Sequence, residues 1–297
     1  MDKRKAPGPD VMSVLFFHRY WHIVGDDVVN TVFMILEIGV MPENLNHTLI
    51  ALIPKVKVLT TPKEFRPISL CNVIYKLVAK VLANRMKLVL DLVISEEQSA
   101  FVPGRYITDN IMAVFECFHS MKQKRKGGQG FFAAKIDMAK AYDRVEWHFL
   151  EGVMNHMGFS ERWCRLVMMC VKTVTYAVLV NGHQSPSFIP IRGLRQGDTL
   201  SPYLFLLCAE GLSAYTKAAV QHKRFYGISP ARGAPTVTHL FFADDSVFFG
   251  RANAHDSSTL KHILQAYERE SGQMVNLQKS EVSFSGKVKP HQRESLE

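Results

Sequence analysis

Apolar residues recur every three to four positions in several long stretches of the chain, a spacing typical of helices that bury one face. The expected helices cover residues 14–40 with a break at Gly25, 71–94, a segment that begins at Thr108, 143–157 and 201–215. Ser201 followed by Pro202 marks a helix start, since serine caps N-termini and proline suits the first turn. Gly158 marks the end of the fourth segment.

The segment from Cys71 to Ile94 has the clearest helical pattern. Its aliphatic residues fall on one side and three lysines fall on the other, which predicts an amphipathic helix with Asn72 as its N-cap. Arg85 lies within the apolar stripe. There it either pairs with a buried carboxylate or extends its guanidinium to solvent, and a functional role is the lesser alternative.

Four other stretches have the pattern of strands. Residues 48–55 and 131–137 are short apolar runs, and Tyr176–Val180 precedes Asn181-Gly182, a pair that favours a tight hairpin turn. Residues 237–250 predict a strand, a tight turn and a second strand. Helices and strands therefore mix without strict alternation, which indicates an α+β or mixed α/β fold rather than a doubly wound sheet.

Composition narrows the classes of function. The net charge of +9 and the pI near 9.3 indicate a polyanionic partner such as nucleic acid. The alternative is that the excess charge only keeps the protein soluble. Five cysteines without a C-x-x-C pair indicate reduced core thiols of an intracellular protein. No signal peptide is evident, and the longest apolar run is too short to cross a membrane, so a soluble protein is expected.

The most unusual stretch is FFADDSVFF, residues 241–249, in which Asp244 and Asp245 stand between two apolar runs. A turn of Ala243 to Ser246 explains them structurally, because aspartate favours turns. Buried like charges are nevertheless costly unless a cation neutralises them. Asp137 ends another apolar run, and if the strands are neighbours, three carboxylates converge. Oxygen donors without histidine suit Mg²⁺ or Mn²⁺, and two such ions about 3.5–4 Å apart support nucleotidyl transfer.

Six short motifs, in order, carry a family resemblance. They are IPK, FRPISLCN, QSAFVPGR, KIDMAKAYDRVEW, GLRQGDTLSP and FADD. Together they resemble the reverse transcriptase domain of non-long-terminal-repeat (LINE-type) retrotransposons, especially the kind abundant in plant genomes. The resemblance covers the chain from KAPGPD to NLQKS. It implies a right-hand polymerase with fingers and palm, in which an antiparallel palm sheet packs on helices.

The resemblance implies a role for particular residues. Asp137, Asp244 and Asp245 would be the catalytic metal ligands, joined by the backbone carbonyl of Met138, with Mg²⁺ as a pair of ions and Mn²⁺ as a substitute. Tyr142 would exclude a ribose 2′-hydroxyl. The other expected nucleotide-binding residues are Lys55, Arg66, Gln196 and Lys279, and the template-binding residues are Gly104 and Arg105. Asp143 is a rival carboxylate that capping of a helix explains.

The resemblance also implies domains and partners. Residues 1–47 would extend the polymerase domain at its N-terminus, 48–130 would form fingers, 131–286 palm, and 287–297 a tail that begins a thumb. Expected partners are an RNA template, a DNA primer and dNTPs, with no membrane, in the nucleus or cytoplasm. Endonuclease and thumb segments are expected in a longer polypeptide. Two positions depart from the family pattern, because Val11 stands for glycine and Thr199 for proline.

Three functions are compatible with these features. The first is an RNA-directed DNA polymerase that uses two metal ions. The second is an inactive retrotransposon remnant that keeps the fold and binds nucleic acid. The third is another Mg²⁺ enzyme, such as a phosphatase or nuclease, but it leaves Tyr142, Gln196 and the expected phosphate-binding cations unexplained.

Overall fold

The computed structural model describes residues 1–4, 6–123 and 130–294, which form two compact units. Unit 1 comprises residues 1–88 and 151–204, and unit 2 comprises residues 89–150 and 205–297. The division falls inside two helices, α6 (Trp147–His156) and α8 (Ser201–Gln221). Both units are discontinuous in sequence. The expected boundaries between N-terminal extension, fingers, palm and tail stay a prediction, and residues 295–297 of the tail lie outside the described ranges.

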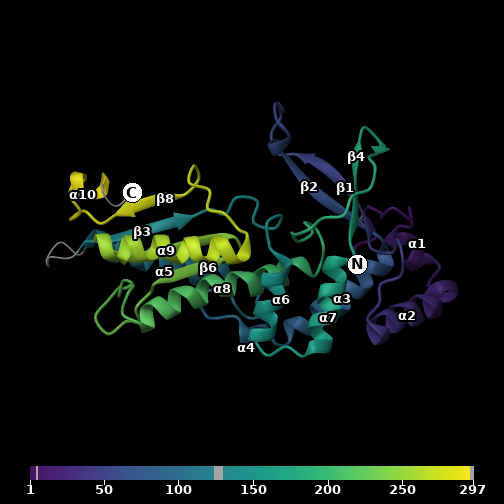
Figure 1. Cartoon of the computed structure of the whole chain (residues 1–297), viewed down its shortest axis with the longest axis horizontal. Helices are drawn as coiled ribbons and strands as arrows, with labels where there is room; N and C mark the ends of the chain where they lie inside the picture. The colour runs from purple at the N-terminus through teal and green to yellow at the C-terminus, as the bar shows by residue number, and fades with distance from the viewer. Residues whose placement is uncertain (5, 124–129, 295–297) are drawn as a thin grey trace. The chain divides into compact units, whose positions relative to one another are not determined.

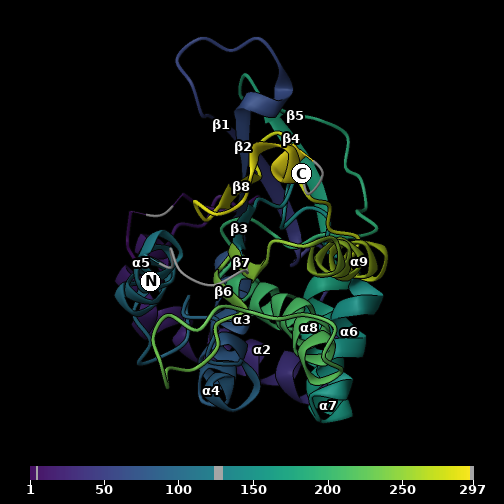
Figure 2. The same ribbon diagram turned by 90° about the vertical axis from the view of Figure 1, so that its left-hand side faces the viewer.

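Unit 1 contains a four-stranded mixed sheet with helices. Its elements are α1 (Val14–Arg19), α2 (Trp21–Ile38), β1 (His47–Pro54), the 3₁₀ turn η1 (Pro62–Glu64), β2 (Phe65–Cys71), α3 (Val73–Lys87), α7 (Glu161–Lys172), β4 (Thr175–Val180) and β5 (His183–Gln184). The strand order is β2-β1-β4-β5, with β1 antiparallel to β2 and parallel to β4. The connection between β1 and β2 extends from the sheet as a long loop (Figure 2).

Unit 2 contains an antiparallel sheet in the order β6-β7-β3-β8. Its elements are α4 (Leu90–Val93), α5 (Ile107–Gln123), β3 (Phe131–Ile136), β6 (His239–Phe242), β7 (Asp245–Arg251), α9 (Ala254–Ser271), β8 (Glu281–Phe284) and α10 (Pro290–Glu294). Figure 1 shows β8 beside β3 in this unit. The predicted strands at 131–137 and 237–250 are thus confirmed.

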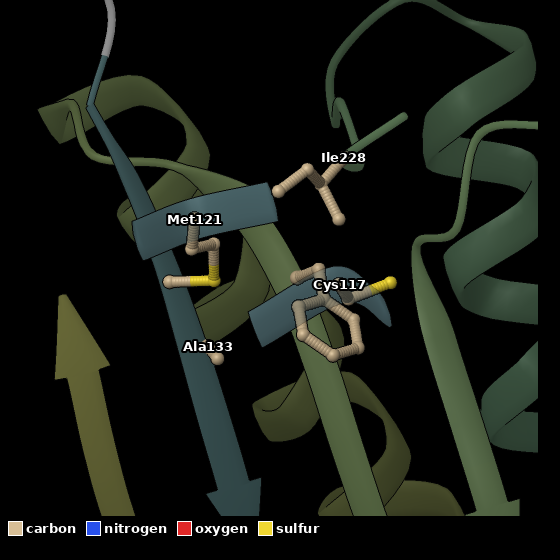
Figure 3. Close-up of a cluster of buried hydrophobic side chains, with 5 residues drawn as sticks. Cys117, Met121, Ala133 and Ile228 are labelled. Carbon is tan, nitrogen blue, oxygen red and sulfur yellow. The ribbon is translucent and has the colours of Figure 1, made fainter. Parts of the chain in front are cut away.

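One cluster of buried side chains joins α5 to this sheet. Cys117 and Met121 of α5 lie against Ala133 of β3 and Phe249 of β7, with Ile228 on the same cluster (Figure 3). Phe249 is fully buried. Burial of such a ring stabilises the fold by roughly 1.5–3 kcal/mol, so this cluster holds α5 against the sheet.

Several predicted elements are correct in type and in approximate extent. The helix expected from Thr108 is α5, and the helix expected at 201–215 is α8, which continues to Gln221. The hairpin at Asn181-Gly182 is confirmed, since both residues have positive φ (50° and 80°) between β4 and β5. All five cysteines are buried and free, as expected of core thiols.

The helix predicted at 71–94 is wrong in its extent, although the predicted apolar stripe is correct as far as Leu82. Cys71 belongs to β2, and α3 ends at Lys87, so Leu88 and Leu92 are more than four-fifths exposed rather than part of a buried stripe. Arg85 is exposed too, which excludes pairing in the core. Asn72 is the N-cap residue of α3, as expected, but its side chain bonds residues 10, 44 and 45 rather than the first turn of the helix.

Two other helix boundaries differ from the prediction. The break in the first helical segment lies at Tyr20, and Gly25 is inside α2, where an added Cβ would lie 3.0 Å from the Trp21 ring. Close packing of that ring therefore accounts for the glycine. Helix α6 begins at Trp147, four residues after Asp143, so the capping role expected for Asp143 at this helix start is wrong.

Val11, one of the two departures from the family pattern, adopts a left-handed backbone conformation with φ of 59°. A β-branched side chain is strained there by about 1–2 kcal/mol, whereas glycine is not. The loop therefore keeps a sharp bend at this position although the residue is unsuited to it.

Candidate active site

The paired aspartates lie at the turn of the β6–β7 hairpin. Phe242 pairs with Asp245, so the two central residues of the turn are Ala243 and Asp244. The prediction of a turn from Ala243 to Ser246 is therefore shifted by one residue, and Asp245 begins β7. Phe241 and Phe248 are buried on the two arms. The apolar runs thus anchor both strands, while both carboxylates reach solvent.

Asp137 follows the last residue of β3, next to this turn in the sheet. Ile136 pairs with Ser246, and the Ser246 hydroxyl donates a hydrogen bond to the Ile136 carbonyl at 3.0 Å. Continuation of that register by one residue places Asp137 beside Asp245. The two acidic strand ends are therefore neighbours in the sheet, as expected from the sequence.

A turn before β8 holds the Asp137 carboxylate. The Asn276 side chain donates to Asp137 Oδ2 at 3.1 Å, and the Asn276 backbone N–H donates to the Asp137 carbonyl at 2.8 Å. The Asp137 N–H in turn donates to the Ser280 hydroxyl at 3.1 Å. Lys279 lies in the same turn and is exposed. Asn276 thus orients the carboxylate and Ser280 holds the Asp137 backbone, and sequence reasoning missed both.

The electrostatics of this cluster show unneutralised negative charge. Partial burial raises the pKa of the Asp244 carboxyl, and the charges of Asp245 and Asp137 raise it further. Burial and the Asp244 charge also raise the pKa of Tyr142 to about 12, so its hydroxyl stays protonated. The Tyr142 ring stacks on Phe205 with centroids 4.9 Å apart. Tyr142 therefore lies close to the acidic turn.

The donor set fits a hard divalent cation by its chemistry. Carboxylate oxygens are the preferred ligands of Mg²⁺, and a bound cation would relieve the mutual repulsion of Asp137, Asp244 and Asp245. In the described part of the chain, no three His, Cys, Asp or Glu side chains already form a closed cluster around one point. The Met138 residue is buried, and the role of its carbonyl stays a prediction.

Three expected nucleotide-binding residues lie on or beside the β1–β2 pair of unit 1. Lys55 follows β1, and its N–H donates to the Glu64 carbonyl at 2.8 Å, while Arg66 of β2 pairs with Ile53. The Gln196 carbonyl accepts a hydrogen bond from the Ser69 N–H of β2 at 2.9 Å. Lys55 and Arg66 are exposed. The Gln196 Oε1 atom is buried and has no hydrogen-bond partner in the described part of the chain, which leaves an acceptor for a ligand.

The two expected template-binding residues differ in their surroundings. Gly104 has a φ of 81° and no atom within 4 Å of an added Cβ, so it is a left-handed turn residue open to solvent. Arg105 donates hydrogen bonds to the carbonyls of Ser95 and Gln98, and to that of Ile94. It also pairs with Asp91 at 2.7 Å. Its guanidinium is therefore committed to the protein, and its template role stays a prediction.

A buried arginine holds the loop that carries Gln196. The Arg195 side chain is 4% exposed, lies 3.7 Å from Asp198, and donates to the Cys170 carbonyl at 2.8 Å. It also donates to the Tyr75 hydroxyl, which itself donates to Asp198 Oδ2 at 2.8 Å. Sequence reasoning missed this arginine. Its position within the motif GLRQGDTLSP was a signal that could have indicated a role.

His239 of β6 predicts a pH dependence of stability. Burial lowers its pKa to about 4, while Glu97 raises and Lys217 lowers that value. The imidazole binds Ser213 and Thr238 in its neutral form. The unfolded chain protonates its histidine below pH 6.5, so we expect folding stability to fall as the pH drops from about 6.5 to about 4. The loss over that window is about 3 kcal/mol.

Urea unfolding of the wild type and of His239→Gln between pH 7 and pH 4 measures this effect. The glutamine amide keeps a donor and an acceptor but does not titrate, so its stability curve should be flatter in this window. A variant curve as steep as that of the wild type would show that other groups cause the loss.

Several known proteins resemble this chain in structure or in sequence. An antiparallel sheet that ends in carboxylates, with helices packed on it, is the palm architecture of nucleotide polymerases. The solved structure of apo telomerase from Candida tropicalis, truncated from its C-terminal domain, matches with a TM-score of 0.58 at 14% identity. The match covers 89% of this chain and 56% of that chain. The right-hand polymerase fold predicted from the sequence is thus confirmed.

The chain belongs to the reverse transcriptase (RNA-dependent DNA polymerase) family, whose model matches residues 53–295. It is 28% identical over 289 residues to a transposon TX1 uncharacterized 149 kDa protein of Xenopus laevis. It is 25% identical over 273 residues to a retrovirus-related Pol polyprotein from a type-1 retrotransposable element R2 of Nasonia vitripennis. The predicted relationship to non-LTR retrotransposon proteins is confirmed at this level.

These relatives are much longer than the chain. The matches cover 97% and 92% of this chain, but 21% and 25% of the TX1 and R2 proteins. The chain is therefore one domain's length of such a protein, and that domain is of the reverse transcriptase family. In the described residues, no helix combines the length and the apolarity that a membrane crossing needs.

Proposed function

We propose that this chain copies an RNA template into DNA by adding dNTPs to a primer 3′-hydroxyl, as the reverse transcriptase domain of a plant-type non-LTR retrotransposon. The observation that carries the proposal is the position of Asp137 at a strand end next to the Asp244–Asp245 turn, in a chain of this family. A nuclear or cytoplasmic location accords with that activity. The net charge of +9 accords with a nucleic-acid partner.

The acidic residues hold two divalent cations in this proposal. When bound, Mg²⁺ or Mn²⁺ supplies the positive charge that favours ionisation of the primer 3′-hydroxyl and stabilises the leaving pyrophosphate. Asp137, Asp244 and Asp245 provide carboxylate oxygens, and the Met138 carbonyl provides another. Asn276 keeps the Asp137 carboxylate in one orientation through its 3.1 Å hydrogen bond, so less ordering is needed on metal binding.

The remaining residues bind and select the nucleotide. Lys55 and Arg66 contact the triphosphate, since guanidinium and ammonium groups bind phosphate oxygens. Gln196 packs beside the incoming nucleotide, and Lys279 assists the departure of pyrophosphate. The Tyr142 ring, held by its stack on Phe205, leaves no room for a ribose 2′-hydroxyl.

The proposal also assigns parts of the chain. Residues 48–130 serve as fingers and 131–286 as palm, preceded by an N-terminal extension of 47 residues and followed by a tail from residue 287. Gly104 and Arg105 lie along the template strand in this assignment.

Primer extension on a short RNA template tests the function. With Mg²⁺ or Mn²⁺, the wild type should extend the primer with dNTPs much faster than with NTPs, because Tyr142 excludes the 2′-hydroxyl. Asp137→Asn should lower the rate at least about a hundredfold, since it removes a charged metal ligand.

Lys135→Gln is the matched control for that substitution. Lys135 is exposed on β3, two residues before Asp137. The substitution removes one charge and leaves the three carboxylates unchanged. Its extension rate should stay within about twofold of the wild type. Absence of extension by a folded wild type, with either ion, contradicts the proposed activity and supports the inactive remnant instead.

A further inference from the structure

We propose that Gln98, in the QSAFVPGR motif, is a positioning residue that holds the Ala243–Asp244 turn in the conformation needed for metal binding. The inference rests on the proposed function for its catalytic consequence, but its structural part does not. The Gln98 Oε1 atom accepts a hydrogen bond from the Ala243 N–H at 3.0 Å, across 145 residues of sequence.

The turn needs such a support because its backbone is strained. Ala243 has a φ of 55°, in the left-handed region that alanine disfavours and glycine adopts freely. Strain of this kind persists only where surrounding contacts determine the conformation, and it recurs at active sites.

Two hydrogen bonds hold the Gln98 side chain through its oxygen, whereas its buried Nε2 atom has no hydrogen-bond partner among the described residues. Its side chain is buried, and Oε1 also accepts from the Ala100 N–H at 2.9 Å. Two backbone donors aimed at one atom require an acceptor there, which fixes the amide with its oxygen toward the turn. Only an amide or carboxylate oxygen of this length satisfies both donors.

The segment around Gln98 is tied to the hairpin and to the motif that follows it. Gln98 forms a parallel bridge with Phe241, in which the Phe241 N–H donates to the Glu97 carbonyl at 2.7 Å. The Ser99 N–H donates to the Phe241 carbonyl at 3.2 Å. Arg105 donates to the Gln98 carbonyl at 2.8 Å. Backbone hydrogen bonds of this motif thus hold β6, and the Gln98 side chain adds a contact to the turn that follows β6.

Gln98→Met tests this contact, because methionine keeps the side-chain length and the apolar volume but is only a weak acceptor. Hydrogen exchange of the Ala243 amide, read by NMR on protein labelled at alanine and phenylalanine, should accelerate about tenfold or more in this variant. The Phe241 amide, bonded to the Glu97 carbonyl, should exchange as in the wild type. Gln98→Leu repeats the measurement if Gln98→Met does not fold.

Asn110→Ala is the matched control. The Asn110 amide donates to the Phe241 carbonyl at 2.6 Å, so it contacts the same strand but not the turn. This variant should lose thermal stability to a similar degree and leave Ala243 exchange unchanged. An Ala243 exchange rate that is unchanged in Gln98→Met, or equally raised in Asn110→Ala, overturns the inference.

Mn²⁺ titration by calorimetry and primer extension measure the consequence. Gln98→Met should weaken Mn²⁺ binding about tenfold and lower kcat by a similar factor, with KM for dNTPs within about twofold. Ala243→Gly removes the left-handed penalty, so it should restore about fivefold of kcat in the Gln98→Met background and change the wild type less than twofold. Equal effects of Ala243→Gly in both backgrounds overturn the coupling.

These measurements separate the two proposals. If the wild type extends no primer, the proposed function fails, whereas the amide exchange and Mn²⁺ affinity still decide the role of Gln98. If Gln98→Met keeps wild-type exchange and Mn²⁺ affinity while the wild type is active, the positioning role fails and the proposed function stands.

Discussion

Asp245→Asn is expected to abolish primer extension while it raises the melting temperature of the metal-free protein. The loss should reach at least about a thousandfold, since each 1.4 kcal/mol of lost transition-state stabilisation slows the reaction tenfold and a metal ligand contributes several kcal/mol. The gain in stability follows because the Asp245 charge raises the pKa of Asp244, which is a sign of repulsion in the folded state. Extension assays and thermal melts measure both effects.

With a divalent metal ion bound, the wild type should become more stable than Asp245→Asn. Ligand at 100 times its Kd stabilises a folded protein by about 2.7 kcal/mol, so Mg²⁺ or Mn²⁺ should raise the melting temperature of the wild type by several degrees. The variant should gain little. Asp143→Asn serves as the control, because Asp143 precedes α6 and lies off both acidic strand ends. If Asp143→Asn also loses activity, or Asp245→Asn keeps it, the ligand assignment is wrong.

Arg195→Met is expected to cost about 3–5 kcal/mol of unfolding free energy, the largest effect of any substitution considered for unit 1. Burial alone lowers the pKa of Arg195, but Tyr75, Cys71 and Asp198 raise it overall, so the guanidinium remains charged. Its removal leaves Asp198 buried without a cation. Urea denaturation of the two proteins measures the difference from the midpoints at constant slope.

Two further variants identify the cause of that loss. Asp198→Asn added to Arg195→Met should recover part of the stability, because the uncompensated buried charge is removed along with its partner. Arg162→Met breaks a pair with Glu37 whose side chains are 59% and 66% exposed, and it should cost at most about 1 kcal/mol. Equal losses for Arg195→Met and Arg162→Met would contradict the buried network as a source of stability.

The Arg195 network also bears on the nucleotide-binding loop. Gly197 has a φ of 96° and passes close to β2, where an added Cβ would lie 3.6 Å from Ile68 and 3.7 Å from the Ser69 carbonyl. Glycine is needed here for the left-handed backbone. Gln196 is thus held between a buried arginine and a left-handed glycine, which fixes its position relative to β2 in unit 1.

Much of the fold was open to prediction from local patterns. Short apolar runs gave the strands that carry Asp137 and the Asp244–Asp245 pair, because alternation and turn residues act over a few positions. The helix pattern was reliable for α5 and unreliable beyond Lys87. Leu88 and Leu92 continue the apolar spacing, yet they are exposed, since periodicity records which residues could share a face and not whether a partner covers it.

The sequence by itself determined the family, the acidic residues and the strands that carry them. These features depend on motifs and periodicity within short stretches of neighbouring residues. Only the tertiary structure decided which distant residues hold those motifs in place. Gln98 meets Ala243 across 145 positions, and Asn276 meets Asp137 across 139. Such contacts depend on strand register and chain topology, and a buried polar side chain leaves no periodic signal from which its partner can be predicted.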